Sequence, residues 1–142
     1  MAERLPTMLQ VSAPAILEAE DDVGERVNDS GEVVPPGQII ADLLAAGLAA
    51  AGWKVEYRWS TYNTHAFDAQ RADHRYDIEV GLVDRDAARW SITAKPRVGL
   101  MKRVFAGKLD PAEHELLRLD IDRTLKADSR VTPMGDWVAE DA

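Results

Sequence analysis

Residues 53–59 read WKVEYRW, and this stretch alternates large apolar side chains with charged ones at every position. Strict alternation of this kind is typical of a strand with one buried and one solvent-exposed face. Residues 76–82 and 90–94 repeat the pattern, with Tyr76 and Trp90 as their first apolar members. The segment between them, residues 84–87, is short and polar, which indicates a hairpin. The sequence therefore predicts three strands of a mainly antiparallel sheet.

A helix is predicted on each side of these strands. From Gln38 to Ala51, isoleucine and leucine recur at three- and four-residue spacing, with prolines before the stretch and glycine after it. A second helix is expected from Asp110 to Lys126, because Asp, Pro and Glu stand where a capping box needs them. The order helix, three strands, helix predicts an α+β two-layer sandwich. In this arrangement two helices cover one face of a sheet of three to five strands.

The 142 residues fit a single domain. We expect residues 1–34 to form an irregular acidic N-terminal segment, with a short strand possible from Met8 to Val11, and residues 35–138 to form the α/β core. Residues 98–105 are expected to add a further strand or a crossover. After the second helix, Val131 to Val138 should run extended and be anchored by Trp137.

The composition narrows the function classes. The chain has no cysteine and a net charge of −8, so disulfides and thiolate metal sites are excluded and nucleic acid is disfavoured as a partner. The first residues lack the apolar core of a signal peptide, and the longest apolar stretch is too short to span a bilayer. We therefore expect a cytoplasmic protein with no cofactor, no metal and no membrane association, whose partner is another protein.

The segment from Ser60 to Arg75 joins two strands that should be neighbours, yet it has sixteen residues, far more than an ordinary hairpin loop. One interpretation is a metal or acid–base site, in which His65, Asp68 and His74 are the candidate catalytic residues. The alternative is a solvated polar loop with Phe67 packed on the core. As binding residues in and beside this loop, we select those with polar or aromatic side chains: Trp59, Tyr62, His65, Arg71 and His74.

Charge is distributed unevenly along the chain. From Glu18 to Glu32 there are seven acids and one base, whereas from Lys95 to Lys108 there are five bases and no acid. The acidic segment predicts contacts to a basic partner through Glu20, Asp21 and Asp22, or else a self-repelling surface loop. The basic segment is interpreted as the polar face of a strand and loop, with a phosphate or nucleic-acid contact as the alternative.

The architecture also resembles that of known proteins. An Ala- and Leu-rich helix, Gly52-Trp53, alternating strands with Trp90, and a capped helix followed by Trp137 are similar to a loose group of small bacterial proteins. Most of these are uncharacterised, and some look like the immunity proteins that neutralise toxins delivered by contact-dependent or type VI systems. The resemblance covers Pro35 to Val138. It implies an immunity-like role and assigns no functional residue.

Three functions follow as hypotheses. The acidic surface, the long loop and the lack of a catalytic signature favour a non-enzymatic protein-binding module that is immunity-like or inhibitor-like. The first alternative is a small enzyme or ligand-binding domain using the 60–75 loop, which requires His65 and His74 to converge with Asp68 or Asp73 on one cavity. The second is an acidic inhibitor that imitates DNA, which requires carboxylates clustered on one side.

Overall fold

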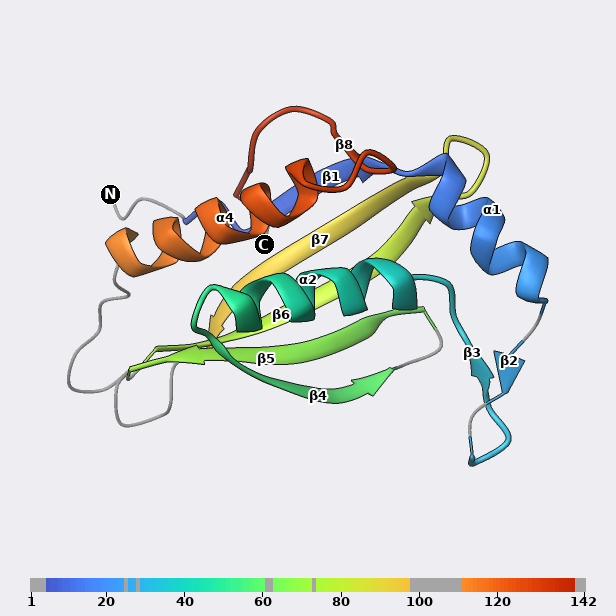
Figure 1. Cartoon of the computed structure of the whole chain (residues 1–142), viewed down its shortest axis with the longest axis horizontal. Helices are drawn as coiled ribbons and strands as arrows, with labels where there is room; N and C mark the ends of the chain where they lie inside the picture. Colours follow the sequence, from blue (N-terminus) through green and yellow to red (C-terminus); the bar gives the residue numbers. More distant parts are fainter. Residues whose placement is uncertain are drawn as a thin grey trace.

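The computed structural model describes residues 5–24, 26–27, 29–60, 63–72, 74–97 and 111–139, except for the side chains of Val23 and of residues 57–59 (Figure 1). Within these residues, a six-stranded sheet forms one layer and three helices form the other. The expected α+β class with a mainly antiparallel sheet is therefore confirmed. The sheet has more strands than the three to five expected, and the helical layer has one helix more.

The main sheet has the strand order β4-β5-β6-β7-β1-β8, and every neighbouring pair is antiparallel. Four consecutive strands form a meander, β1 pairs with the outer side of β7, and β8 pairs with β1. Two further strands, β2 and β3, form a separate hairpin. The bounds are β1 Met8–Ser12, β2 Arg26–Val27, β3 Val33–Val34, β4 Lys54–Ser60, β5 His65–Arg71, β6 His74–Asp84, β7 Arg89–Arg97 and β8 Thr132–Pro133.

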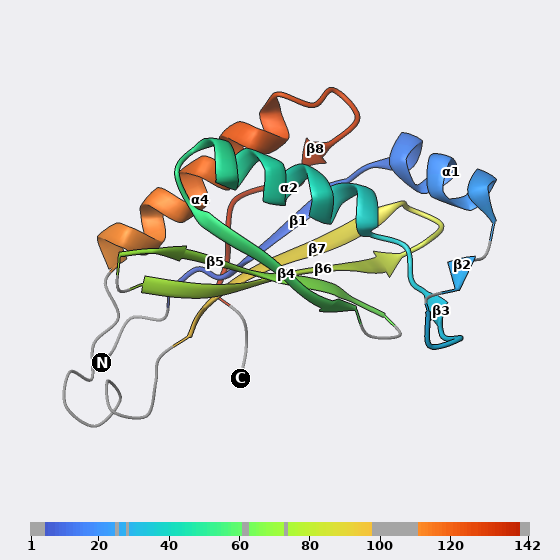
Figure 2. The same cartoon turned by 60° about the horizontal axis from the view of Figure 1, so that its bottom comes forward.

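All three helices lie on the same face of the sheet, as Figures 1 and 2 both show. Helix α2 (Gln38–Ala50) lies over β4, β5 and β6, and α4 (Pro111–Lys126) packs beside it. Helix α1 (Pro14–Val23) continues from β1 and meets α2. The other face of the sheet has no helix among the described residues.

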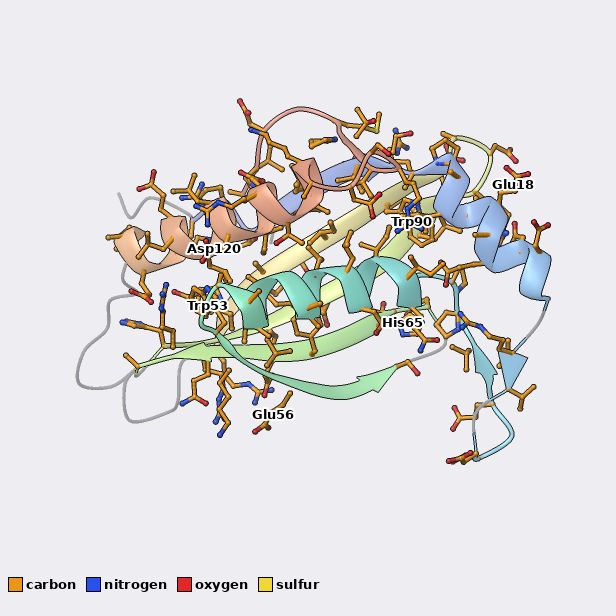
Figure 3. All side chains as sticks on the ribbon, viewed as in Figure 1. Glu18, Trp53, Glu56, His65, Trp90 and Asp120 are labelled. Carbon is orange, nitrogen blue, oxygen red and sulfur yellow. The ribbon has the colours of Figure 1, made fainter. Side chains whose placement is uncertain are left out.

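The alternation read from the sequence places the core correctly. Trp53, Ile78 and Ile92 are at most 3% exposed and face the helices. Figure 3 shows Trp53 and Trp90 between the sheet and the helical layer, with Glu56 pointing away. The apolar stripe of α4 is equally buried, and the expected hairpin between β6 and β7 is present. The predicted element at residues 98–105 and the cap at residue 110 lie outside the described residues.

The expectation of an irregular N-terminal segment is wrong, whereas the short strand expected from Met8 to Val11 is present as β1. Strand β1 is part of the main sheet, and Leu9 and Val11 are buried in the core. Helix α1 follows it and buries Ile16 and Leu17. The sequence hid this helix because its apolar residues are few and a glutamate, Glu20, also faces inward. Strand β1 and helix α1 therefore contribute to the hydrophobic core.

Two tryptophans attach neighbouring segments to α4. The indole N–H of Trp53 donates to Asp120 Oδ2 at 2.8 Å, and that of Trp137 donates to Asp122 Oδ1 at 2.9 Å. Val138 forms a bridge with Met8. The expected role of Trp137 as the anchor of an extended C-terminal stretch is therefore confirmed.

His114 of α4 is fully buried against the sheet. Its ring lies 5.6 Å from the ring of Tyr76, and its Nε2–H donates to the carbonyl oxygen of Pro6 at 2.8 Å. Burial lowers the pKa of His114 below 6.5, although the hydrogen bond to Pro6 opposes this shift; the nearby charge of Arg118 adds to it. The folded state therefore holds this histidine neutral.

We therefore expect the free energy of unfolding to decrease as the pH falls below about 6.5. The unfolded chain, where histidine titrates near its ordinary pKa, then binds a proton that the folded chain excludes, so the stabilisation is present above that pH and is lost toward acid. Urea unfolding at about pH 7.5 and about pH 5.5 measures the effect. His114→Leu should reduce the difference between the two pH values. Equal pH dependence in His114→Leu and the wild type would contradict the assignment.

Candidate functional site

The segment from Ser60 to Arg75 is not a long loop. It contains β5, which pairs with β4 from His65, opposite Ser60, to Gln70, opposite Lys54. On its other side β5 pairs with β6 along its whole length. Only residues 61–64 separate β4 from β5, and only residues 72 and 73 separate β5 from β6. Strand β5 was not predicted because residues 65–69 are all buried. Its sequence therefore lacks the alternation of apolar and polar residues that marks a strand with one solvent-exposed face.

The three candidate catalytic residues do not meet. His65 faces the helices and is 2% exposed, while Asp68, three residues along the same strand, faces the opposite side. His74 pairs with Arg71 at the far end of β5, roughly 20 Å of strand from His65. Their polar groups therefore cannot act on one substrate atom.

His65 and Asp68 have structural contacts instead. The Nε2–H of His65 donates to the carbonyl oxygen of Pro35 at 2.7 Å, and a carboxylate oxygen of Asp68 lies 3.9 Å from Arg97. The Arg71 guanidinium lies 5.2 Å from the ring centroid of Trp53, which is a cation–π distance. Trp59 is in β4 opposite Ala66, but its side chain lies outside the described residues, as does Tyr62.

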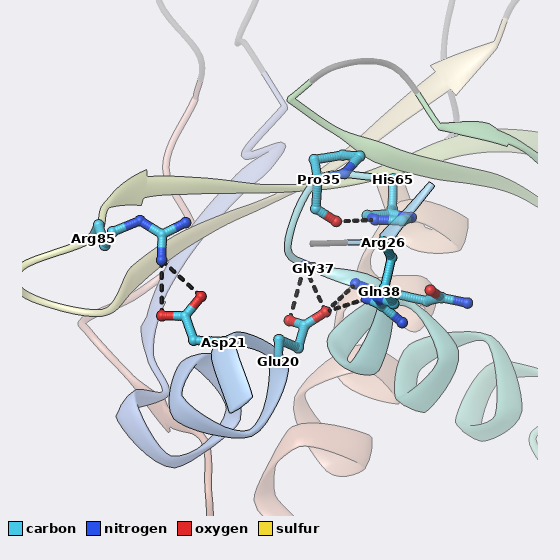
Figure 4. A network of polar contacts seen from close by, with 8 residues as sticks. All are labelled: Glu20, Asp21, Arg26, Pro35, Gly37, Gln38, His65 and Arg85. Carbon is cyan, nitrogen blue, oxygen red and sulfur yellow. Dashed lines mark hydrogen bonds and ion pairs between the residues drawn. The ribbon is translucent and has the colours of Figure 1, made fainter. Parts of the chain in front are cut away.

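The acidic segment contains a buried carboxylate with several hydrogen-bond donors around it, that of Glu20. Glu20 is 6% exposed, and its Oε2 accepts from the Gly37 N–H at 2.9 Å. Its Oε1 accepts from the N–H groups of Gly37 and Gln38, each at 3.2 Å, and from Arg26 Nη2 at 3.1 Å (Figure 4). A carboxylate here satisfies amides at the start of α2 and complements the helix dipole. Glu20 therefore joins α1, α2 and the β2–β3 hairpin.

Gly37 makes this arrangement possible. Its φ is +125°, in a region that other residues rarely adopt, and a Cβ there would lie 3.3 Å from His65 Cδ2. The backbone can thus approach both Glu20 and His65. Glu20 was expected to contact a partner together with Asp21 and Asp22. This expectation is wrong for Glu20, which is interior, whereas Asp21 and Asp22 are exposed.

Asp21 forms the second ion pair of this region. Both of its carboxylate oxygens accept from Arg85 Nη1 at 2.9 Å, and Arg85 lies in the turn between β6 and β7. The side chains are 52% and 55% exposed. Since Glu20 is buried and Asp21 is paired, the described residues between 18 and 32 do not present the continuous row of free carboxylates that DNA imitation requires.

The β2–β3 hairpin projects from the body of the molecule beyond the end of α1 (Figure 1). Val27 pairs with Val33 across it, and these side chains are 58% and 52% exposed, the two highest values among the large apolar side chains described. Asp29 and Glu32 lie in the connection between them and are exposed. An apolar pair is therefore presented to solvent within an acidic surrounding.

A pocket of about 380 Å³ lies between this hairpin and the end of α1. Its lining residues are Glu20, Asp21, Gly24, Arg26, Val33, Val34, Pro36 and Arg85. Around it, described residues 18–34 and 84–89 carry eight acids and three arginines. The local field is therefore negative even though two ion pairs lie in the pocket.

The sequence pointed to the acids of this region but not to Arg26, Arg85, Val27, Val33 or Gly37. Arg26 had a detectable signal, because a single base within a run of seven acids indicates a local ion pair. Arg85 and Gly37 depend on contacts with segments that are distant in the sequence. Val27 and Val33 pair locally, across two strands of two residues each.

The described part of the chain also lacks a cluster of metal ligands and a membrane-spanning helix. Its histidines and carboxylates form no group of three that could hold a metal ion. None of its helices has the length and apolar character needed to cross a bilayer. No family model, curated protein or solved structure matches the chain.

Proposed function

We propose that this chain is a non-enzymatic protein-binding module, immunity-like or inhibitor-like, which contacts another protein mainly through the β2–β3 hairpin. The observation that carries the proposal is the cross-strand pair Val27–Val33, exposed on a projecting hairpin and surrounded by carboxylates. Apolar side chains at the centre of a charged rim are the usual composition of a protein-binding surface.

The way the hairpin is held supports the same function. Two strands of two residues each are too short to be stable on their own. Arg26 attaches β2 to the buried Glu20, and Pro35, next to β3, accepts the hydrogen bond from His65. A short, exposed element held at its base by buried polar contacts is pre-organised, which reduces the entropy lost on binding.

The alternative of an enzyme or ligand-binding site in the 60–75 loop has lost its geometric support. That segment is a strand, and His65, Asp68 and His74 lie on different faces and at different ends of it. The protein-binding proposal assigns no catalytic role to these residues, and His65 enters it only through its hydrogen bond to Pro35.

Replacing both hairpin valines should weaken binding of the partner by at least about tenfold, which corresponds to about 1.4 kcal/mol. The double variant Val27→Ser/Val33→Ser removes the apolar centre and leaves the charges in place. Capture from a lysate of the organism that encodes the chain identifies candidate partners, and calorimetry on the purified pair measures the affinity.

The matched control is Leu116→Ser/Leu119→Ser, because these α4 residues are 46% and 49% exposed and lie far from the hairpin. It should bind as the wild type does. A partner whose affinity is the same for both double variants, or capture of no protein at all, would refute the proposal.

A further inference from the structure

The two ion pairs that line the hairpin pocket differ in exposure. In the Glu20–Arg26 pair the carboxylate side chain is 4% exposed, and its oxygens accept four hydrogen bonds. In the Asp21–Arg85 pair both side chains are more than half exposed, and the carboxylate has only Arg85 as a described partner. The first pair is part of the fold, while the second lies at the surface.

An exposed pair of this kind contributes only about 0–1 kcal/mol to stability. Arg85 lies in a turn, between two strands whose pairing does not depend on its side chain. Replacing Arg85 with another cation on Asp21 therefore has a small energetic cost. Asp21 thus remains available to a cation that a partner brings into the pocket.

The remainder of the pocket fits a long basic side chain. Val33, Val34 and Pro36 form an apolar wall, along which an aliphatic stem can lie while its charged head reaches a carboxylate. The exposed acids Glu18, Asp22 and Glu32 add a negative field that attracts a cation and repels an anion. The volume of about 380 Å³ exceeds what a single side chain needs.

We propose that this pocket receives an arginine or lysine side chain of the partner protein, which replaces Arg85 as the ion-pair partner of Asp21. The proposal rests on the proposed protein-binding function and specifies the partner as one with a basic residue between apolar ones. Arg85 then occupies the acceptor site in the free protein and leaves it in the complex.

The competing possibility is an anion site. Arg26 and Arg85 each use one nitrogen in their described bonds, so their other N–H groups can donate to a carboxylate of a ligand. The two possibilities predict opposite effects of removing Arg85. Loss of a competitor strengthens binding of a cation, whereas loss of a donor weakens binding of an anion.

The test uses the full chain and three peptides, acetyl-Val-Arg-Val-amide, acetyl-Val-Gln-Val-amide and acetyl-Val-Glu-Val-amide, titrated by NMR at low salt. The arginine peptide should shift the amide signals of residues 20–34, 37 and 85 and bind more tightly than the other two. Arg85→Gln should strengthen its binding at least about threefold, and Asp21→Asn should weaken it by a similar factor. Added salt should weaken it as well.

Arg123→Gln is the matched control, because Arg123 is an exposed arginine, paired with Asp120 on α4, and its loss changes the net charge equally. It should leave the affinity unchanged. Tighter binding of the glutamate peptide, lost in Arg85→Gln, would replace the proposal with an anion site. No shift with any peptide, or equal effects of both arginine variants, would overturn it.

These outcomes are separable from those of the valine experiment. If the pocket binds no peptide but the partner's affinity still depends on Val27 and Val33, the protein-binding function stands and only the basic anchor is wrong. If the peptide binds and the valines have no effect on the partner's affinity, the pocket stands and the hairpin's role is wrong.

Discussion

Glu20→Ala should lower the free energy of unfolding by about 2–3 kcal/mol, more than replacement of an exposed acid of residues 18–32. The substitution removes the acceptor of the Gly37 and Gln38 N–H groups, and Gly37 is buried. It also leaves Arg26 without its carboxylate. Because Arg26 is one-third exposed, water compensates part of that loss, which keeps the effect below that of breaking a fully buried pair.

Urea unfolding with detection by circular dichroism measures this change, and the melting temperature should fall by about 6–12 °C. Glu18→Ala is the matched control, since Glu18 lies on the same helix, carries the same charge and is exposed. Glu20→Gln, which keeps an acceptor oxygen but loses the charge, should fall between the two. If Glu20→Ala were as stable as Glu18→Ala, the buried network would not hold α1 and α2 together.

The same substitution should release the hairpin before it unfolds the core. Amide hydrogen exchange at residues 26–34 should accelerate in Glu20→Ala more than exchange in β6 and β7, because only the hairpin depends on Arg26 for its attachment. Partner binding through Val27 and Val33 should then weaken as well. Stability and recognition are thus coupled through one carboxylate.

The sequence predicts those parts of the fold in which one side of a strand or helix is exposed to solvent. In β4, β6 and β7 the apolar and polar positions alternate because each strand has a core face and an open face. In α4 the stripe Leu117, Ile121 and Leu125 has a helical period and is fully buried. A periodic sequence pattern reports this kind of half-burial directly.

Elements that lack this contrast were missed. Strand β5 is buried on both faces, so its alanines, Phe67 and Asp68 show no period of two. Helix α1 directs Glu20 inward together with two apolar residues. His65 was chosen for chemistry because a histidine in a supposed loop is expected to be available, whereas the structure places it in the core with a backbone carbonyl as its partner.

The candidate site could be predicted only in part, because its polar side chains contact residues that are distant in the sequence. Asp21 and Asp22 are exposed, as the acidic run indicated. The partner of Asp21, however, lies 64 residues away, and the amides bound by Glu20 lie 17 and 18 residues away. Such pairs are set by the way α1 crosses the end of the sheet, and no local pattern records that crossing.

Gly47→Ala should destabilise the protein even though alanine is the better helix former. Gly47 lies where α2 packs against α4, and a Cβ built on it would overlap the Oγ1 and Cγ2 atoms of Thr124 and lie 2.8 Å from its Cβ. Rotation of the threonine side chain cannot relieve the contact with Cβ, and Oγ1 is also held by a 2.8 Å hydrogen bond to the carbonyl oxygen of Asp120. The helices must therefore move apart.

Two opposing effects decide the sign of this change. Replacing glycine with alanine inside a helix contributes about 1 kcal/mol of stability, whereas forcing an extra carbon into a packed interface costs about 1–3 kcal/mol. Because the overlap involves a β-branched side chain with few alternative rotamers, we expect the cost to be near the upper end, and the net loss to be about 1–2 kcal/mol. Urea unfolding of the full chain measures it.

A double-mutant cycle with Thr124→Ala separates packing from helix propensity. Removing Oγ1 and Cγ2 takes away the two closest atoms, so Gly47→Ala should cost at least about 1 kcal/mol less in the Thr124→Ala background than in the wild type. If Gly47→Ala stabilised the wild type by the amount helix propensity predicts, or cost the same in both backgrounds, the close approach of α2 to α4 would not hold. The packing of the helical layer, which positions Asp120 for Trp53, would then need another explanation.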